Sequence, residues 1–208
     1  MIKPPPTNPV EPLSDEQRAE SLERTLAMRP TGGPVRVFAY GSLLWDPCFE
    51  HEAKEAARLV GWVRRTCLWT VHARGSLECP GLFYGLDPEV NGMCEGAVYT
   101  LCEDQLDDGL NQLWRREMHA GVYQPGWFDL ETDAGVVRAL AFVVNRDHPQ
   151  YTGLMDIETS AKFIAAAHGK FGSCADYFIA TQTSLHAQGV EDEELGRLTQ
   201  RVQSLIGH

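Results

Sequence analysis

Residues 35–45 read VRVFAYGSLLW, an apolar run that is interrupted by Tyr40, Gly41 and Ser42. The first six residues are mostly β-branched or aromatic, which is typical of a short buried strand. Gly41 permits backbone geometry that other residues resist, and Ser42 supplies a hydroxyl group. The stretch therefore predicts a strand followed by a tight turn. The same residue types would also suit an ordinary connection, so the turn alone does not indicate a function.

More strand signals follow along the chain, and glycine and proline separate them. One helix, over about residues 103–118, interrupts this region, and the pattern after residue 150 is helical at 157–168, 174–188 and 191–206. Strands followed by helices predict an α+β fold with a mixed, barrel-like sheet, because a regular βαβ protein would alternate the two. The other predicted strands are RLVGWV (58–63), TCLWTVH (66–72), LFYGL (82–86), CEGAVYTL (94–101), VYQPGWFDL (122–130) and VVRALAFVV (136–144).

The start of the chain differs from the rest in composition. The proline-rich segment MIKPPPTNPVEPL predicts an extended arm. Ser14 and Gln17 have the spacing of a capping box, which predicts a helix over residues 14–28 before a break rich in proline and glycine. We therefore expect an N-terminal arm with a peripheral helix over residues 1–34, and a single domain over residues 35–208.

The overall charge and the cysteines restrict the possible partners and location. The 208-residue chain has a formal net charge of −11 at pH 7, which repels nucleic acids and anionic membranes, so we expect neither as a partner. No apolar run approaches the roughly 20 residues that cross a bilayer. The six cysteines lack C-x-x-C spacing and follow no secretory signal, which predicts reduced thiols and a cytoplasmic location.

The helix near residue 110 places one carboxylate among apolar side chains. At about 100° per residue, Leu106, Leu110 and Leu113 form a stripe, and Glu117 falls roughly 20° from the line of Leu106. A carboxylate that faces a core is costly in its charged form, so its pKa should rise and suit proton transfer near neutral pH. Alternatively, the helix ends here and Glu117 leans into solvent or pairs with an arginine.

Other residues are weaker candidates for chemistry. Asp107 and Asp108 lie off the apolar stripe, so we expect them to be solvated. Ser42 does not belong to a G-x-S-x-G nucleophile motif. Nothing marks Cys48 or Cys174 as reactive, since buried inert cysteine is common. The histidines have no metal-ligand spacing, and no metal ion is predicted.

A set of motifs in this order resembles one known family. The strand ending in VFAYGSL (37–43) and the helix ending in LWRREMHAGVY (113–123) are similar to the ChaC-like, glutathione-specific γ-glutamylcyclotransferases. The leading segment SDEQRAESL (14–22) resembles the bacterial branch, and the resemblance covers roughly residues 35–190. Other segments that match in order are RRTCLW (64–69), RGSLECPG (74–81), EGAVYTL (95–101), HPQYTG (148–153) and CADYF (174–178).

The resemblance implies a fold and a reaction. The fold is the γ-glutamylcyclotransferase α+β fold, with helices packed around a mixed barrel-like sheet. The reaction converts glutathione to 5-oxoproline and cysteinylglycine by internal acyl transfer, without a metal ion or other cofactor. By position, Glu117 would be the general base and Tyr177 would lie near the substrate. The residues that the resemblance assigns to substrate binding are Val37, Phe38, Ala39, Tyr40, Gly41, Ser42 and Leu43.

The turn after the first strand then has a specific expected role. Its backbone N–H groups would stabilise the oxyanion that forms on the substrate's carbonyl, because glycine allows the backbone to approach closely. One departure from the family pattern follows the acid. Some members have a short G-G-Y turn there, whereas Tyr123 comes two residues later in this chain, as in the bacterial branch.

Two other functions stay open from the sequence. The chain could act on other γ-glutamyl amines or dipeptides, because loops that the sequence does not place would hold the leaving group. It could also be a binding protein that holds a γ-glutamyl ligand unconverted, although such a protein gains nothing from a carboxylate on an apolar stripe. The sequence indicates no oligomeric state.

Overall fold

The computed structural model describes residues 2–207, which form two compact units. The barrel unit comprises Glu11–Arg64 and Leu86–Asn145. The helical unit comprises the residues up to Val10, Arg65–Gly85 and the chain from Arg146 onward. Each unit is described by itself below.

A closed, mixed β-barrel forms the core of the barrel unit, as the strand-rich middle of the sequence predicts. The strands pair in the order β1-β3-β2-β4-β5, and β5 closes the barrel through parallel pairs with β1 and β3. Val37 and Leu140, which are paired across the closing β1–β5 contact, are both fully buried. The strands are β1 (Arg36–Ala39), β2 (His51–Thr70), β3 (Gly81–Leu101), β4 (Tyr123–Thr132) and β5 (Gly135–Val144).

Two strands are longer than the sequence predicts. The expected pair 58–63 and 66–72 is one strand, β2, and the pair 82–86 and 94–101 is one strand, β3. Both predicted breaks, at 64–65 and 87–93, are wrong because these residues lie within continuous strands. Asn91 (φ 67°) lies in the second of these segments and does not end β3. The first seven residues of β2 are charged or small and mostly exposed, so no alternation of apolar residues predicts a strand there.

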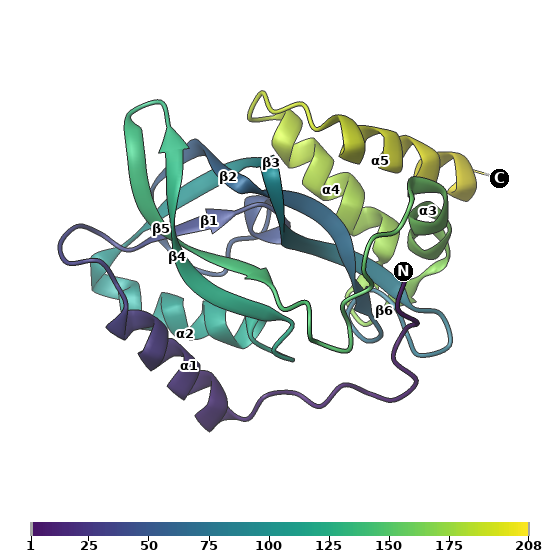
Figure 1. The fold of residues 1–208 in the computed structure, drawn as a ribbon, viewed down its shortest axis with the longest axis horizontal. Helices are drawn as coiled ribbons and strands as arrows, with labels where there is room; N and C mark the ends of the chain where they lie inside the picture. Colours follow the sequence, from purple (N-terminus) through teal and green to yellow (C-terminus); the bar gives the residue numbers. More distant parts are fainter. Residues whose placement is uncertain (1, 208) are drawn as a thin grey trace. The chain divides into compact units, whose positions relative to one another are not determined.

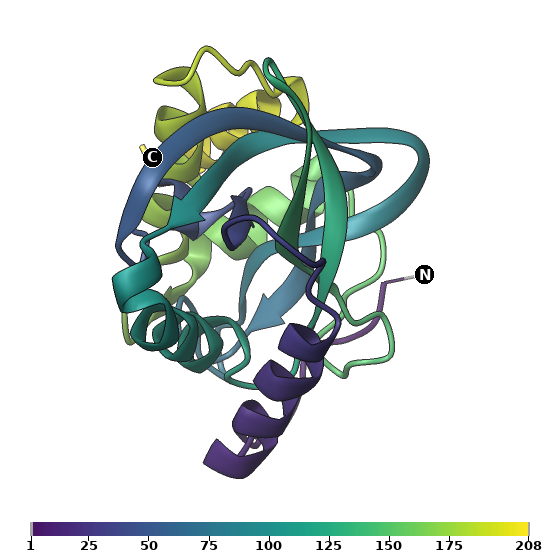
Figure 2. The same cartoon turned by 90° about the vertical axis from the view of Figure 1, so that its left-hand side faces the viewer.

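Two helices of the barrel unit lie side by side, as Figure 2 shows for the purple α1 and the teal α2. α1 (Asp15–Ala27) begins with the capping box of Ser14 and Gln17, which confirms the helix predicted there. The indole N–H of Trp114 donates to the hydroxyl of Ser21 at 3.2 Å, so a side chain of α2 binds α1 directly. The remaining helical elements of this unit are η1 (Ser42–Leu44), η2 (Glu103–Gln105) and α2 (Leu106–Glu117).

The helical unit packs three helices together (Figure 1). Each helix begins with a side-chain cap, from Asp156, Ser173 and Asp192 respectively. These caps satisfy backbone N–H groups that have no partner within the helix, which is why the sequence predicts the starts of the helices well. The elements are α3 (Ile157–Ala166), α4 (Cys174–His186) and α5 (Glu193–Ile206), with the short strands β6 (His168–Gly169) and β7 (Gly172–Ser173).

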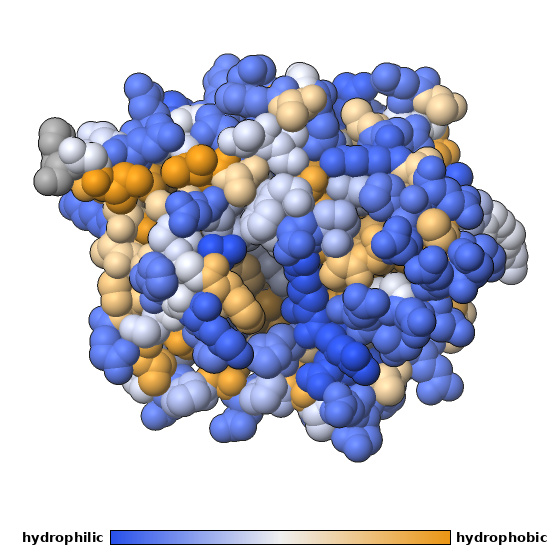
Figure 3. Space-filling model, turned by 180° about the vertical axis from the view of Figure 1, so that it is seen from behind, coloured by the Kyte–Doolittle hydropathy of each residue, from blue (hydrophilic) through white to orange (hydrophobic). Residues whose placement is uncertain are grey.

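The surface is largely hydrophilic. On the face drawn in Figure 3, hydrophilic residues cover most of the area, and hydrophobic residues stand in small separate groups. Within residues 2–207, no helix has the length and the apolar character needed to cross a membrane. All six cysteines lie in this described part of the chain, and none of them forms a disulfide.

Candidate active site

Glu117 is the last residue of α2, at the end of a helix that buries one face against the barrel. Leu110, Leu113 and Trp114 on that face are 2% exposed or less. The Glu117 side chain is only 14% exposed, as the helical periodicity predicts, so the interpretation that it leans into solvent is wrong. The rest of that alternative is confirmed, since α2 ends at Glu117 and its carboxylate has an arginine neighbour, Arg116. Asp107 and Asp108 are exposed, as predicted.

Burial raises the pKa of the Glu117 carboxyl above its ordinary value, and the nearby Arg116 guanidinium opposes this shift. The position at the C-terminal end of α2 acts in the same direction as burial, because the carbonyl dipoles there disfavour negative charge. A carboxyl group with a raised pKa can both accept and return a proton near neutral pH.

The raised pKa predicts how Glu117→Gln changes stability with pH. Above about pH 4.3 an unfolded chain releases the Glu117 proton, whereas the folded protein keeps it to higher pH. The free energy of unfolding of the wild type should therefore fall as pH rises through the pKa of Glu117 in the folded protein. The free energy of unfolding of Glu117→Gln should not show this decrease. Urea unfolding of both proteins at several pH values measures the difference, with Glu23→Gln on the exposed side of α1 as the control.

An equal stability difference between wild type and Glu117→Gln at pH 4 and pH 8 would contradict the raised pKa.

A small polar cluster surrounds the carboxylate. The Arg116 Nε lies 3.6 Å from Oε1 of Glu117, and the Arg116 Nη1 lies 3.1 Å from Oδ2 of Asp46. The half-buried Cys48 is close by, since burial and the charge of Glu117 both raise the pKa of its thiol, while Arg116 lowers it. Asp46 and Cys48 follow η1, so the cluster joins the end of α2 to the segment after β1.

The segment of residues 40–46, here called loop 40–46, has its carbonyl groups held by side chains from other elements. Arg64 Nε donates to the carbonyl of Tyr40 at 2.6 Å, and Arg64 also donates to the carbonyl of Glu95. The remaining contacts are Tyr99 Oη to the carbonyls of Leu43 (3.1 Å) and Leu44 (3.3 Å), Lys54 Nζ to Leu44 (3.1 Å) and Arg116 Nη1 to Asp46 (2.6 Å).

The N–H groups of the same loop are left available. Within residues 2–207, the backbone N–H groups of Gly41, Ser42 and Leu43 donate no hydrogen bond, and Gly41 and Leu43 are buried. Buried residues almost always have partners for their N–H groups, so Gly41 and Leu43, with the half-buried Ser42 between them, indicate a site for an anionic oxygen or a carbonyl of a ligand. The N–H groups of Leu44 and Asp46 donate to the carbonyls of Gly41 and Ser42 within the loop. The first three N–H groups of this turn therefore have the arrangement expected of an oxyanion hole.

The other predicted substrate residues lie in two places. Val37, Phe38 and Ala39 form β1 and are at most 1% exposed, so they fix the start of loop 40–46 and do not offer side chains to a ligand. Tyr40 donates its hydroxyl to the carbonyl of Phe142 on β5 at 2.8 Å. Tyr177 belongs to the helical unit, where its hydroxyl accepts from the N–H of Tyr84 at 3.5 Å, and its contact with a substrate stays a prediction.

Tyr99→Phe should lower kcat/KM for the substrate by roughly threefold to tenfold, because one buried hydroxyl binds two carbonyls of the loop. The ring itself should stay in place, since it packs edge-on against Phe49 and His51. Steady-state kinetics and a thermal melt of the same preparation measure the two effects. A variant that loses stability but keeps the wild-type kcat/KM would show that the hydroxyl supports only the fold.

The weaker candidates do not form a second site. Burial raises the pKa of the Cys174 thiol to about 12, and its Sγ donates to the carbonyl of Leu82 at 3.0 Å, so it is a poor nucleophile. The raised pKa of Cys48 disfavours its thiolate as well. In the part of the chain that the structure describes, no three histidine, cysteine, aspartate or glutamate side chains are grouped to hold a metal ion.

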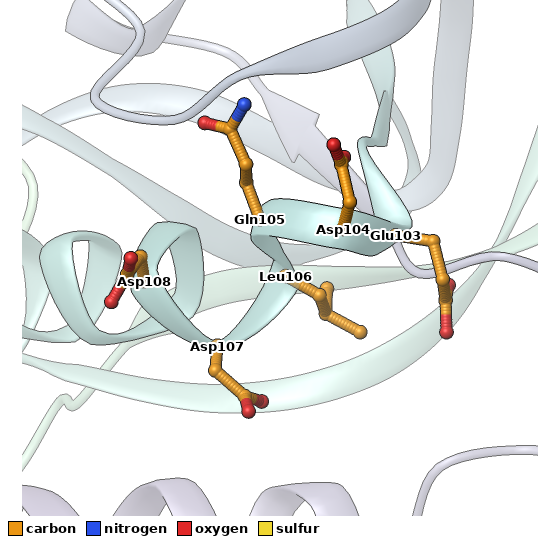
Figure 4. Close-up of a pocket in the computed structure, with 6 residues that line it drawn as sticks. All are labelled: Glu103, Asp104, Gln105, Leu106, Asp107 and Asp108. Carbon is orange, nitrogen blue, oxygen red and sulfur yellow. The ribbon is translucent and has the colours of Figure 1, made fainter.

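A surface pocket lies at the opposite end of α2 from Glu117. Figure 4 shows its lining, six consecutive residues from Glu103 to Asp108, of which four are acidic and point in different directions. α2 rises about 1.5 Å per residue, so its eleven steps from Leu106 to Glu117 separate the pocket from the buried carboxylate by about 16 Å. Acidic side chains at a helix start are favourable for the helix itself, which explains them without a ligand.

Sequence patterns missed the residues that hold the loop. Arg64, Tyr99 and Lys54 reach it from β2 and β3, and no local spacing links them to residues 40–46. Arg116 carried a weak signal, because it precedes Glu117 on the flank of the apolar stripe. Arg64 lies in a half-buried stretch of β2 beside a second arginine, Arg65, so no local pattern distinguishes it.

Comparisons with known proteins agree on one family. The model of the ChaC-like protein family matches residues 35–205. A glutathione-specific γ-glutamylcyclotransferase of Escherichia coli (strain K12) is 39% identical over 93% of this chain and 83% of its own length. The glutathione-specific γ-glutamylcyclotransferase 1 of Rattus norvegicus is 28% identical over 82% of this chain and 79% of its own. The crystal structure of a yeast γ-glutamylcyclotransferase specific to glutathione superposes with a TM-score of 0.75 at 18% identity, covering 84% of this chain and 97% of the yeast chain, so the fold is the γ-glutamylcyclotransferase fold.

Proposed function

The chain belongs to the ChaC-like protein family, and we propose that it is a γ-glutamylcyclotransferase that converts glutathione to 5-oxoproline and cysteinylglycine. One observation carries the proposal: a shielded carboxylate, Glu117, is joined through Arg116 to a loop with three unused N–H donors. An acid with a raised pKa and a set of oxyanion donors are the two groups that internal acyl transfer needs.

The reaction forms its new bond within the substrate. The α-amine of the γ-glutamyl group attacks its own γ-carbonyl carbon, the amide bond to cysteine breaks, and no water is consumed. The protein must fold the γ-glutamyl chain so that nitrogen and carbon approach to about 3–3.5 Å. Because the reacting groups are already joined, orientation is the main contribution that the binding residues have to make.

Glu117 supplies the proton transfers in this mechanism. The free amine, not the ammonium group, is the nucleophile. As its nitrogen bonds to the γ-carbonyl carbon and becomes the ring nitrogen of 5-oxoproline, it loses one proton, and the Glu117 carboxylate accepts that proton. The resulting carboxylic acid then gives a proton to the departing amide nitrogen, which leaves as the amine of cysteinylglycine. One carboxyl group with a raised pKa serves both steps, and its net protonation is unchanged at the end of the cycle.

Loop 40–46 supplies the charge stabilisation. As the amine attacks, negative charge develops on the γ-carbonyl oxygen. The N–H groups of Gly41, Ser42 and Leu43 are proposed to donate to that oxygen. The donors need no rearrangement, because side chains of other strands already hold the carbonyl groups of the loop.

Further parts of the proposal come from the sequence. They are a substrate contact for Tyr177, a single catalytic domain over residues 35–208 that follows an N-terminal arm and helix, and a cytoplasmic location.

The direct test is incubation of the purified protein with glutathione, followed by mass spectrometry of the products. The proposal expects equal amounts of 5-oxoproline and cysteinylglycine. Glutamate in place of 5-oxoproline would mean that water attacks the carbonyl, and the cyclisation mechanism would be wrong. The same assay with γ-glutamyl-alanine separates glutathione specificity from a broader activity on γ-glutamyl amines. A stable complex with unconverted glutathione would instead favour a binding protein.

A further inference from the structure

Arg116 contacts both halves of the proposed active site. Its Nη1 donates to the carbonyl oxygen of Asp46 at 2.6 Å and lies 3.1 Å from the Oδ2 of the same residue. Its Nε lies 3.6 Å from Oε1 of Glu117. A guanidinium group is planar, with its donors at fixed angles, so these contacts fix two directions at once.

Asp46 is hydrogen-bonded to the segment that carries the N–H donors of the loop, and so it links these donors to Arg116. The N–H of Asp46 donates to the carbonyl of Ser42 at 2.9 Å, and the N–H of Leu44 donates to the carbonyl of Gly41 at 3.0 Å. The short helical turn that presents Gly41, Ser42 and Leu43 is therefore closed at Asp46. A displacement of Asp46 would change the direction in which those three N–H groups point.

The degree of burial differs between the two partners of Arg116. The Arg116 side chain is 26% exposed and Glu117 is 14% exposed, whereas the Asp46 side chain is 60% exposed and the neighbouring Arg115 is exposed. Exposed ion pairs contribute little because solvent screens them, but a pair that is largely shielded interacts more strongly. Shielding therefore strengthens the contact with Glu117, and the contact with Asp46 depends on its hydrogen-bond geometry.

We propose that Arg116 is a positioning residue for the cyclotransferase reaction, which holds Glu117 and loop 40–46 at a fixed spacing and keeps Glu117 ionisable. This inference rests on the proposed function. It assigns Arg116 two separable effects: the two contacts with Asp46 set the geometry of the loop, and the positive charge acts on the carboxylate.

Among the groups around Glu117, Arg116 is the main charge that acts on the carboxylate. From the segment after η1, Asp46 pairs with Arg116 and Cys48 presents a thiol whose pKa burial raises. From α1, which packs on α2, Arg18 pairs with Asp15 at 2.5 Å. Removal of Arg116 should therefore raise the pKa of Glu117 further.

The experiment compares Arg116→Gln, Arg116→Lys and the control Arg115→Gln in steady-state kinetics with glutathione from pH 5 to 9. For Arg116→Gln we expect a kcat about tenfold lower, since the charge-assisted hydrogen bonds that orient the oxyanion donors are lost and those donors act in the transition state. The acidic limb of kcat/KM should move about one pH unit upward, because the base holds its proton to higher pH. Arg116→Lys should return the acidic limb to its wild-type position, because that effect needs only the positive charge. It should not restore kcat, because the two contacts with Asp46 need the planar guanidinium group. Arg115→Gln should behave as the wild type.

The results separate the two proposals. If the wild type does not cyclise glutathione, the proposed function fails, and a ¹³C NMR titration of the Glu117 carboxyl still tests whether Arg116→Gln raises its pKa. If the wild type is active and Arg116→Gln keeps both the wild-type kcat and the wild-type acidic limb, only the role of Arg116 is wrong. If Arg116→Gln does not fold, Arg116→Lys provides the test, because an unchanged kcat in that variant would overturn the positioning role.

Discussion

Glu117→Gln should lower kcat for glutathione by about 10²–10⁴-fold while the protein stays folded. The amide has the shape of the carboxyl group and fits the same shielded position, 14% exposed, but it cannot accept the proton of the substrate's amine. KM should change little, because the lost interaction belongs to the proton transfers and not to binding of the ground state. Steady-state kinetics with detection of 5-oxoproline measures both constants.

Asp108→Asn is the matched control for this variant, since Asp108 is an exposed carboxylate on the same helix. It should keep the wild-type rate. Near-normal turnover by Glu117→Gln would mean that the base lies elsewhere. A large loss in both variants would point to a general effect of charge on α2.

Gly96→Ala should destabilise the protein by about 3 kcal/mol, near the upper end for an overpacked core, and should reduce activity as well. Gly96 lies in β3 next to the end of β1, and a Cβ atom there would come within 2.2 Å of the carbonyl oxygen of Ala39 and 3.1 Å of the Phe38 ring. Both contacts are with the strand that leads into loop 40–46, so relief of the clash must move that strand. The melting temperature should fall by roughly 6–12 °C.

Gly196→Ala on α5 is the control, because a Cβ atom there meets only the Gln182 side chain at 3.7 Å. Alanine in an open helical position should raise stability by up to about 1 kcal/mol. Thermal melts and kcat/KM for both variants test the pair. A Gly96→Ala protein with an unchanged melting temperature would show that β1 and β3 can separate at no cost.

Local sequence signals predicted the helices of this protein well. The caps at Ser14 and Ser173 mark the starts of α1 and α4, and Gly189 (φ 75°) marks the end of α4. The strands were predicted in the right places but with wrong lengths. The charged start of β2 has no apolar alternation, and it is a strand because the barrel provides partners such as β4 at Arg58.

The residues of the candidate site also differ in whether local sequence signals could reveal them. Glu117 could be found because it breaks the apolar pattern of one helix, and that signal lies within a dozen residues. The side chains that hold loop 40–46 come from distant parts of the chain. Tyr99 reaches Leu43 across 56 residues, and Arg64 reaches Tyr40 across 24. Such contacts depend on the closed barrel, so periodicity and spacing do not reveal them.

The barrel closure also has a consequence for how the nascent chain acquires activity. β1 is synthesised before its partners β3 and β5, and the hydroxyl of Tyr40 reaches its acceptor on Phe142 across 102 residues. Contacts of such high sequence separation form slowly. Loop 40–46 therefore takes its shape only after the later strands have been synthesised, and a chain that stops before residue 142 would lack the strand that fixes it.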